Sequence, residues 1–200
     1  QMQDRQEQLA QIYRELRIYL EQQGMVEPIV CGDGPLQAQI FMLGEAPGAE
    51  EVREGRPFVG KAGKNLDTFL QQTGIAREQI FISNAVKFRP YRIGPTGRRA
   101  NRPPTRQEKA WCCPFLEREL VLLRPQLIVT LGNTALQAIL GERALIGACH
   151  GKCTKDAQGR AVFPLYHPAS IIYNQKLKEV YAQDLAALRI YLQSGIAKGR

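Results

Sequence analysis

The chain has 200 residues, of which 44% are hydrophobic and 23% are charged, a composition that excludes a disordered or fibrous protein. No apolar run approaches the roughly 20 residues that a membrane-spanning helix needs. The 27 Lys and Arg residues outnumber the 19 Asp and Glu residues, and the resulting formal charge of +8 favours polyanionic partners, because neutralised phosphates release condensed counterions.

The first half of the chain predicts a helix followed by alternating strands and helices. Apolar residues recur at helical spacing from Leu9 to Leu20, which indicates an amphipathic helix that ends at Gly24. We expect residues 1–24 to form this helix and to pack on a single domain comprising residues 1–200. The elements predicted next are a buried strand over 39–43, a helix over 64–72 and a strand over 80–83.

The second half continues this alternation. Thr105 opens the string T-R-Q-E, a capping box that starts a helix reaching about Leu123. The remaining predicted elements are a strand over 126–131, a helix over 133–140, a hairpin over 144–165 that leads into a fourth strand, and a helix over 175–193. Strands that alternate with helices indicate an α/β fold: a three-layer α/β/α sandwich with a central, mainly parallel four-stranded sheet.

Polar residues follow the ends of the predicted strands. The segments at these ends are Gly44-Glu45, Asn84, Gly132-Asn133 and Tyr166-His167-Pro168. In open parallel sheets, ligands bind in the crevice beyond the carboxyl ends of the strands. A carboxylate, an amide and an imidazole should therefore converge on one pocket.

The positive charge is concentrated in one segment. Between residues 87 and 106 there is no acidic residue, and the basic ones are Lys87, Arg89, Arg92, Arg98, Arg99, Arg102 and Arg106. This clustering favours nucleic acid over a merely soluble basic surface. The five cysteines follow no framework spacing, so we expect reduced thiols, most of them in the core, and no metal site.

Three motifs carry a resemblance to a known family. They are G-E-A-P-G with G-R-P-F-V-G-x-A-G over 44–63, S-N-A-V-K over 83–87, and Y-H-P-A-S over 166–170. A glycine-rich loop alone would be weak evidence, since it binds any phosphate or simply turns. In this order, the motifs resemble the family 4 uracil-DNA glycosylases, which are typical of bacteria and archaea. The likeness extends from about Ile29 to the last helix.

The resemblance implies a monofunctional glycosylase that hydrolyses the N-glycosidic bond of flipped-out deoxyuridine in DNA, with water as nucleophile, and so starts base excision repair. Glu45 takes the position that orients the water and favours the cationic sugar. His167 takes the position that stabilises the departing uracil, helped by backbone N–H groups from Gly44 to Ala46. The implied base contacts are Asn84 on the pyrimidine edge, Phe58 stacked on the ring and Glu51 against its C5 edge.

The same resemblance implies contacts with the DNA around the lesion. The loop over 167–172 would enter the minor groove, with Ser170 on a phosphate. The other expected DNA contacts are Lys87, Arg89, Arg98, Arg99 and Arg102. The implied partner is uracil-containing DNA, and we expect a monomer in the cytoplasm, associated with the nucleoid and with no membrane.

The family typically holds an iron–sulfur cluster on four cysteines, and here the sequence departs from it. Only Cys112 matches a ligand position, while Phe88 stands at another and the N-terminal pair is missing. We expect no cluster and no other cofactor, because one ligand cannot hold it. The long loop after Phe88 either grips DNA phosphates, or Phe88 and Trp111 replace the cluster with an apolar core, or both.

Other interpretations remain for the activity and for single residues. The activity could be directed at another damaged base, such as hypoxanthine, xanthine or mismatched thymine, or the chain could be a silent module that binds damaged DNA. A nucleotide hydrolase is disfavoured, since the phosphate-binding string is missing. Phe58 could be a core aromatic, Asn84 a loop cap, and Glu45 and Glu51 solvated acids.

Overall fold

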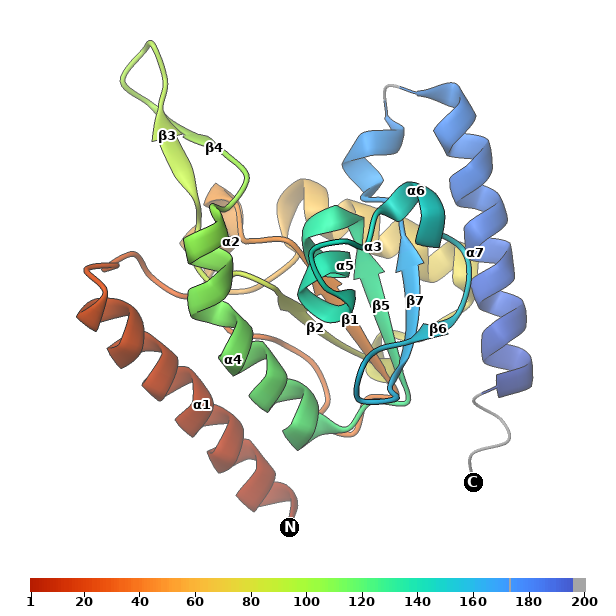
Figure 1. Cartoon of the computed structure of the whole chain (residues 1–200), viewed down its shortest axis with the longest axis horizontal. Helices are drawn as coiled ribbons and strands as arrows, with labels where there is room; N and C mark the ends of the chain where they lie inside the picture. The colour runs from red at the N-terminus through yellow and green to blue at the C-terminus, as the bar shows by residue number, and fades with distance from the viewer. Residues whose placement is uncertain (173, 196–200) are drawn as a thin grey trace.

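The computed structural model describes residues 1–172 and 174–195 and contains the expected parallel sheet (Figure 1). Its strand order is β2-β1-β5-β7-β6. The four parallel strands are β1 (Ile40–Gly44), β2 (Ile80–Asn84), β5 (Leu127–Leu131) and β7 (Ala161–Leu165). A two-residue strand, β6 (Thr154–Lys155), adds antiparallel to β7 as a fifth strand at the edge. The α/β fold with a mainly parallel sheet is thus confirmed.

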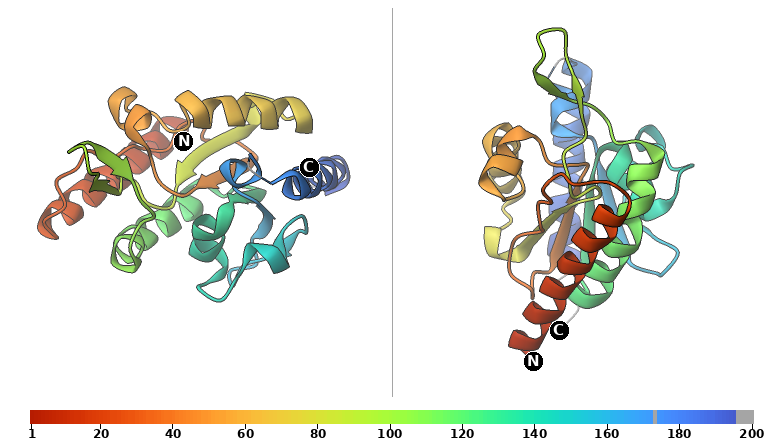
Figure 2. Two further views of the ribbon diagram at one scale, coloured as in Figure 1. Left: turned by 90° about the horizontal axis from the view of Figure 1, so that it is seen from above. Right: turned by 90° about the vertical axis from the view of Figure 1, so that its left-hand side faces the viewer.

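Helices cover both faces of the sheet, as Figure 2 shows. One face carries α1 (Met2–Gln22), α4 (Arg106–Leu123) and α5 (Gly132–Leu140), and the other carries α3 (Gly60–Thr73) and α7 (Gln175–Gly195). Strand β1 feeds both layers, because Phe41 and Leu43 point to the first and Ile40 and Met42 to the second. Because β1 is buried on both faces, its sequence is a continuous apolar run rather than an alternating one.

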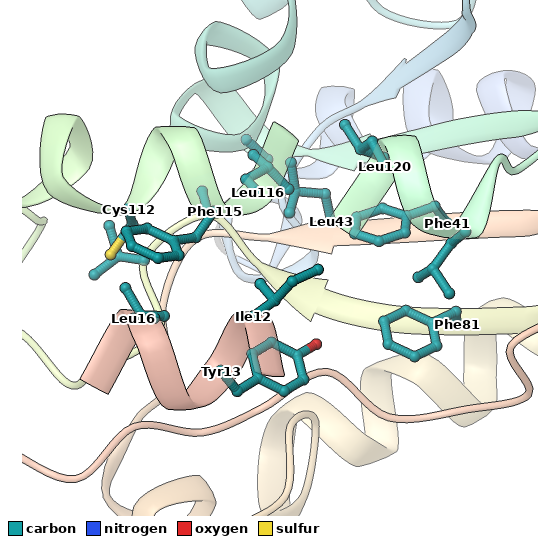
Figure 3. Close-up of a cluster of buried hydrophobic side chains, with 14 of the residues drawn as sticks. Ile12, Tyr13, Leu16, Phe41, Leu43, Phe81, Cys112, Phe115, Leu116 and Leu120 are labelled. Carbon is teal, nitrogen blue, oxygen red and sulfur yellow. The ribbon is translucent and has the colours of Figure 1, made fainter. Parts of the chain in front are cut away.

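The N-terminal helix packs on α4. Ile12, Tyr13 and Leu16 of α1 meet Phe115 and Leu116 of α4 in a buried cluster, to which the sheet adds Phe41 and Phe81 (Figure 3). Helix α4 begins at the predicted capping box, where Thr105 Oγ1 accepts the Glu108 N–H over 3.1 Å. The local sequence signal and the tertiary packing agree here.

Some elements were missed or misplaced. Helix α3 begins at Gly60 rather than Lys64, and the helices α2 (Ala49–Glu54) and α6 (Ile146–Cys149) were not predicted. The segment 144–165 holds α6 before its hairpin, so its first arm is helical. Two 3₁₀ turns, η1 (Arg77–Gln79) and η2 (Pro168–Ile171), precede β2 and α7. Such short elements carry too few residues to show a period.

The loop after Phe88 forms a β-hairpin rather than an irregular excursion. Its strands β3 (Tyr91–Ile93) and β4 (Arg99–Asn101) pair with each other and project from the body of the molecule (Figure 1). We call residues 91–101 the arm. The Arg99 guanidinium lies 4.1 Å from the centre of the Tyr91 ring, and both side chains bond Glu27, which follows α1. These contacts fix the arm to the body.

The order in which successive strands are added to the sheet changes direction at β1. From β1 the chain passes to β2 on one side, and it then crosses to β5 on the other side of β1. This switch point is where parallel α/β sheets open a crevice for ligands. Glu45 follows β1 and helix α5 follows β5, so both lie at the crevice.

Candidate active site

A pocket of about 330 Å³ opens at the carboxyl ends of β1 and β2. Seven of its lining residues were predicted from the sequence, namely Gly44, Glu45, Ala46, Glu51, Phe58, Asn84 and His167, and Arg102 reaches it from the DNA-contact set. The lining residues that were not predicted include Lys61, Asn65 and Asn101. Glu45, Asn84 and His167, which the strand-end rule predicted to converge, thus line one pocket although they are far apart in the chain.

Glu45 is held at two points. Its backbone carbonyl accepts the Val86 N–H over 2.9 Å, so the loop after β2 fixes the loop after β1. Its Oε2 accepts the Thr134 hydroxyl over 2.6 Å from the first turn of α5. The carboxylate is thus oriented within the pocket, and its other oxygen has no such partner among the described residues.

His167 stands at the exposed rim of the pocket. Its Nδ1 accepts the Ala169 N–H over 3.0 Å, which in the neutral ring leaves the proton on Nε2. Desolvation lowers the pKa of His167, and the nearby charge of Glu45 opposes this shift. A neutral imidazole with an Nε2–H donor can stabilise an anion that forms beside it.

Asn84 and Phe58 approach each other across Gly44. A Cβ at Gly44 would lie 2.5 Å from Asn84 Oδ1 and 2.7 Å from Phe58 Cζ, so only glycine leaves room for both side chains. Phe58 has a φ of +55°, a strained conformation for an aromatic residue. Backbone strain at a pocket residue favours a ligand contact over a plain core position.

Glu51 is buried beneath the loop and anchors it. Its Oε1 accepts the Gly48 N–H over 3.0 Å and its Oε2 accepts the Val59 N–H over 3.1 Å. These bonds tie the start of α2 to the segment before α3. Glu51 is therefore not a solvated loop acid. It lines the pocket, and its two hydrogen bonds act as a clamp that holds the loop in place.

Lys87 corrects one expectation. It is only 1% exposed and pairs with Glu119 over 2.5 Å, while its Nζ donates to the Asn84 carbonyl over 2.6 Å. A buried and paired ammonium has no face for a DNA phosphate. The prediction of Lys87 as a DNA contact was wrong. A lysine in a basic segment is expected to be exposed, and the sequence did not indicate that the fold buries this one.

The arginines divide by the partners they hold. Arg89 donates to Asn101 Oδ1 over 2.7 Å, and Arg99 is held by Glu27 as described above. Arg102 donates twice to Glu108, which raises the pKa of its guanidinium. Arg92 and Arg98 are exposed on the arm and bond no other side chain within residues 1–172 and 174–195. Ser170 is exposed, and its hydroxyl donates to the His167 carbonyl.

The cysteines do not fit the cluster that the resemblance implies. Cys112 lies in an apolar cluster with the fully buried Phe88 and with Leu16, Met25 and Ile29. Cys113 and Cys153 are exposed free thiols. No three His, Cys, Asp or Glu side chains gather as metal ligands in the part of the chain that the structure describes. Since an iron–sulfur cluster needs four thiolates, the residues present do not fit one.

Thr134 and Asn101 are site residues that the sequence did not reveal. Thr134 follows the strand-end segment Gly132-Asn133 by one position, so the strand-end rule pointed beside it. Asn101 sits at the root of the arm, and its position in the pocket depends on the β3–β4 pairing. That pairing was not predicted.

Comparisons with known proteins identify similar sequences. A model described as the uracil DNA glycosylase superfamily matches residues 31–189. The type-4 uracil-DNA glycosylase of Sulfurisphaera tokodaii is 37% identical over 80% of this chain and 73% of its own length. The type-4 uracil-DNA glycosylase of Thermotoga maritima is 36% identical over 82% and 83%.

A solved structure is similar in fold. The crystal structure of Pedobacter heparinus SMUG2 superposes with a TM-score of 0.50 at 17% identity, covering 79% of this chain and 77% of that one. Within the described residues, the helices are all too short or too polar to cross a membrane. From its matched family model and its relatives, the chain belongs to the uracil DNA glycosylase superfamily.

Proposed function

We propose that the chain is a uracil-DNA glycosylase, a DNA N-glycosylase that removes uracil by hydrolysis at the start of base excision repair. The observation that carries this proposal is the convergence of Glu45, His167, Asn84 and Phe58 on one pocket at the switch point of the sheet. The type-4 enzymes that share 36–39% identity with most of this chain support the same activity.

The reaction separates charge, and the pocket offers a group for each sign. As the bond between C1′ and N1 breaks, positive charge grows on the sugar and the electron pair stays on uracil. The Glu45 carboxylate favours the cationic sugar and accepts a proton from the water that attacks C1′. The Nε2–H of a neutral His167 stabilises the uracil anion at its O2. Water then supplies the hydroxyl of the abasic sugar, and a proton balances the leaving base.

Base selection in this proposal belongs to Asn84 and Phe58. The Asn84 amide offers one donor and one acceptor to the edge of uracil, an arrangement that misfits cytosine. Phe58 stacks on the flipped base. The Glu51 clamp supports the loop against the C5 edge, where thymine carries a methyl group, and so disfavours thymine.

The partner is uracil-containing DNA. Ser170 and the arginines in and next to the arm contact the phosphate backbone of this DNA. The chain works as a monomer, in the cytoplasm at the nucleoid. We propose that it works without an iron–sulfur cluster; the packing of Phe88 and Cys112 in one buried apolar cluster supports this.

The test is glycosylase activity on single- and double-stranded oligonucleotides that carry one uracil. We expect an alkali-labile product from the wild type and a loss of at least about 100-fold in Glu45→Ala and His167→Ala. If the protein binds uracil-DNA but releases no product, the proposed enzymatic activity is wrong and a binding module is favoured. If only another base is excised, the proposed substrate is wrong. Iron and sulfide, measured on the same preparation, should be absent.

A further inference from the structure

One pocket contact lies outside the charge-stabilising pair described above. Thr134 Oγ1 donates to Glu45 Oε2 over 2.6 Å, a short hydroxyl–carboxylate bond. The two residues are 89 positions apart, and the bond crosses the switch point from α5 to the loop after β1. It therefore ties together the two edges of the crevice in which the reaction is proposed to occur.

We infer that Thr134 is a positioning residue that directs the Glu45 carboxylate toward the attacking water. The end of a glutamate side chain rotates in a broad energy well, so a free carboxylate offers its oxygens in many directions. The hydroxyl of Thr134 holds Oε2 and leaves Oε1 as the oxygen that accepts the water. This inference rests on the proposed function.

The backbone of Glu45 makes this restraint effective. The carbonyl of Glu45 is already bonded to the Val86 N–H, so the start of the side chain is fixed from the β2 side. Thr134 fixes its end from the β5 side. With both ends held, the carboxylate keeps one orientation while the base flips and the sugar moves toward it.

The same turn of α5 also accommodates His167. Gly132, the first residue of α5, has a φ of +83°, and a Cβ there would lie 3.1 Å from the His167 Cβ. The first turn of α5 thus contacts both charge-stabilising residues.

A purely structural role for Thr134 predicts different behaviour from a positioning role. If the hydroxyl only stabilised the fold, its removal would lower the stability and would act independently of the Glu45 side chain. If it acts through Glu45, its removal should lower kcat and should cost nothing once the carboxylate is gone. The variants below separate these two cases.

The experiment measures kcat and KM from steady-state cleavage of a uracil oligonucleotide. Thr134→Val keeps the shape and removes the donor, and we expect kcat to fall about 10- to 100-fold with KM nearly unchanged. Thr134→Ser keeps the donor and should stay within about threefold of wild type. Thr130→Val is the matched control, because the buried Oγ1 of Thr130 has no partner in the described structure; its kcat should equal that of the wild type.

A double-mutant cycle with Glu45→Ala decides the case. In that background, Thr134→Val should change the residual rate by less than about twofold. An equal loss in both backgrounds, a fully active Thr134→Val, or a Thr134→Ser as slow as the valine variant would each overturn the inference. These outcomes need an active wild type; a wild type without product on any uracil substrate would instead overturn the proposed function, and the inference with it.

Discussion

The two ring nitrogens of His167 have different surroundings, and this difference determines how the residue can act. Nδ1 is occupied by the Ala169 N–H, so a proton there would face another donor and break the η2 turn. Nε2 keeps its hydrogen in the neutral ring and remains a donor. Since desolvation lowers the pKa of His167 below its usual 6.5, the neutral form dominates at neutral pH.

This arrangement predicts that glycosylase activity is lost on the acid side. The rate should fall as the pH drops through a pKa below 6.5, because protonation removes the Ala169 bond and disturbs the loop. The same shift makes His167 favour folding fully above pH 6.5 and less as the pH falls through the lowered pKa. The pH profile of single-turnover rates checks this.

The control for that profile is His167→Gln, which keeps a neutral donor but cannot titrate. It should be slower than the wild type at neutral pH and should lack the acid limb that belongs to the histidine. If the acid limb persists unchanged in the glutamine variant, another group causes it, and the role assigned to the His167 ring is wrong.

The arm carries two kinds of arginine: one whose side chain is bonded within the protein and two whose side chains are free in the described structure. Arg99 is held by Glu27 and the Tyr91 ring and serves to fix the arm. Arg92 and Arg98 point to solvent without partners in the described structure.

We predict that the free arginines contribute more to DNA affinity than the held ones. Arg92→Ala with Arg98→Ala should weaken DNA binding and reduce the slope of log K against log salt by about 2, roughly one for each phosphate contact. Arg99→Ala should change the slope less, because Glu27 already neutralises that charge. Titration of labelled duplex at several salt concentrations measures both.

Arg118→Ala is the control for the arm. Arg118 pairs with Glu15 of α1 and lies far along α4 from the arm, so its removal should leave the salt slope unchanged. An arm variant that binds duplex with the salt slope of the wild type would mean that the arm does not contact phosphates. In that case the hairpin serves only to carry Asn101 and Arg102 into the pocket.

A buried polar network connects α1 and α4 to the end of β2, where Asn84 lines the pocket. Glu119 of α4 accepts the Tyr13 hydroxyl of α1 over 2.7 Å and the Ser83 hydroxyl of β2 over 2.9 Å. Its other oxygen pairs with Lys87, which in turn holds the Asn84 carbonyl. The N-terminal helix is thus linked to the loop that carries the proposed base-reading amide.

Breaking this network on one side should be costly. Lys87→Met leaves the Glu119 carboxylate buried without its counter-charge, and we expect unfolding free energy to fall by about 3–5 kcal/mol. Adding Glu119→Gln removes the uncompensated charge while its carbonyl still accepts from Tyr13 and Ser83, so the double variant should regain part of the loss. Urea unfolding followed by circular dichroism measures both.

The result that would contradict this account is a Lys87→Met variant that loses less than about 1 kcal/mol, the cost typical of an exposed pair. The pair would then be reached by water, and Lys87 would regain its candidacy as a DNA contact. Thermal unfolding of Arg118→Ala supplies the comparison, because its partner Glu15 lies at the surface.

Apart from Glu51 and Phe58, which were expected only from the family resemblance, the sequence by itself determined the parallel sheet, the capping box of α4 and the strand-end residues Glu45, Asn84 and His167. These follow from apolar runs, turn residues and strand ends, which are local signals that neighbouring residues in the chain carry. The strand-end rule works because parallel strands all present their carboxyl ends at one edge of the sheet.

Only the tertiary structure decided which of these groups are free to act. It buried Lys87 against Glu119, anchored Glu51 beneath its loop, folded the arm and placed Thr134 beside Glu45. Each of these outcomes depends on contacts between residues far apart in the chain. The charge and the hydrogen-bonding capacity of a side chain are set by its partners, and local sequence does not specify partners that the fold brings from elsewhere.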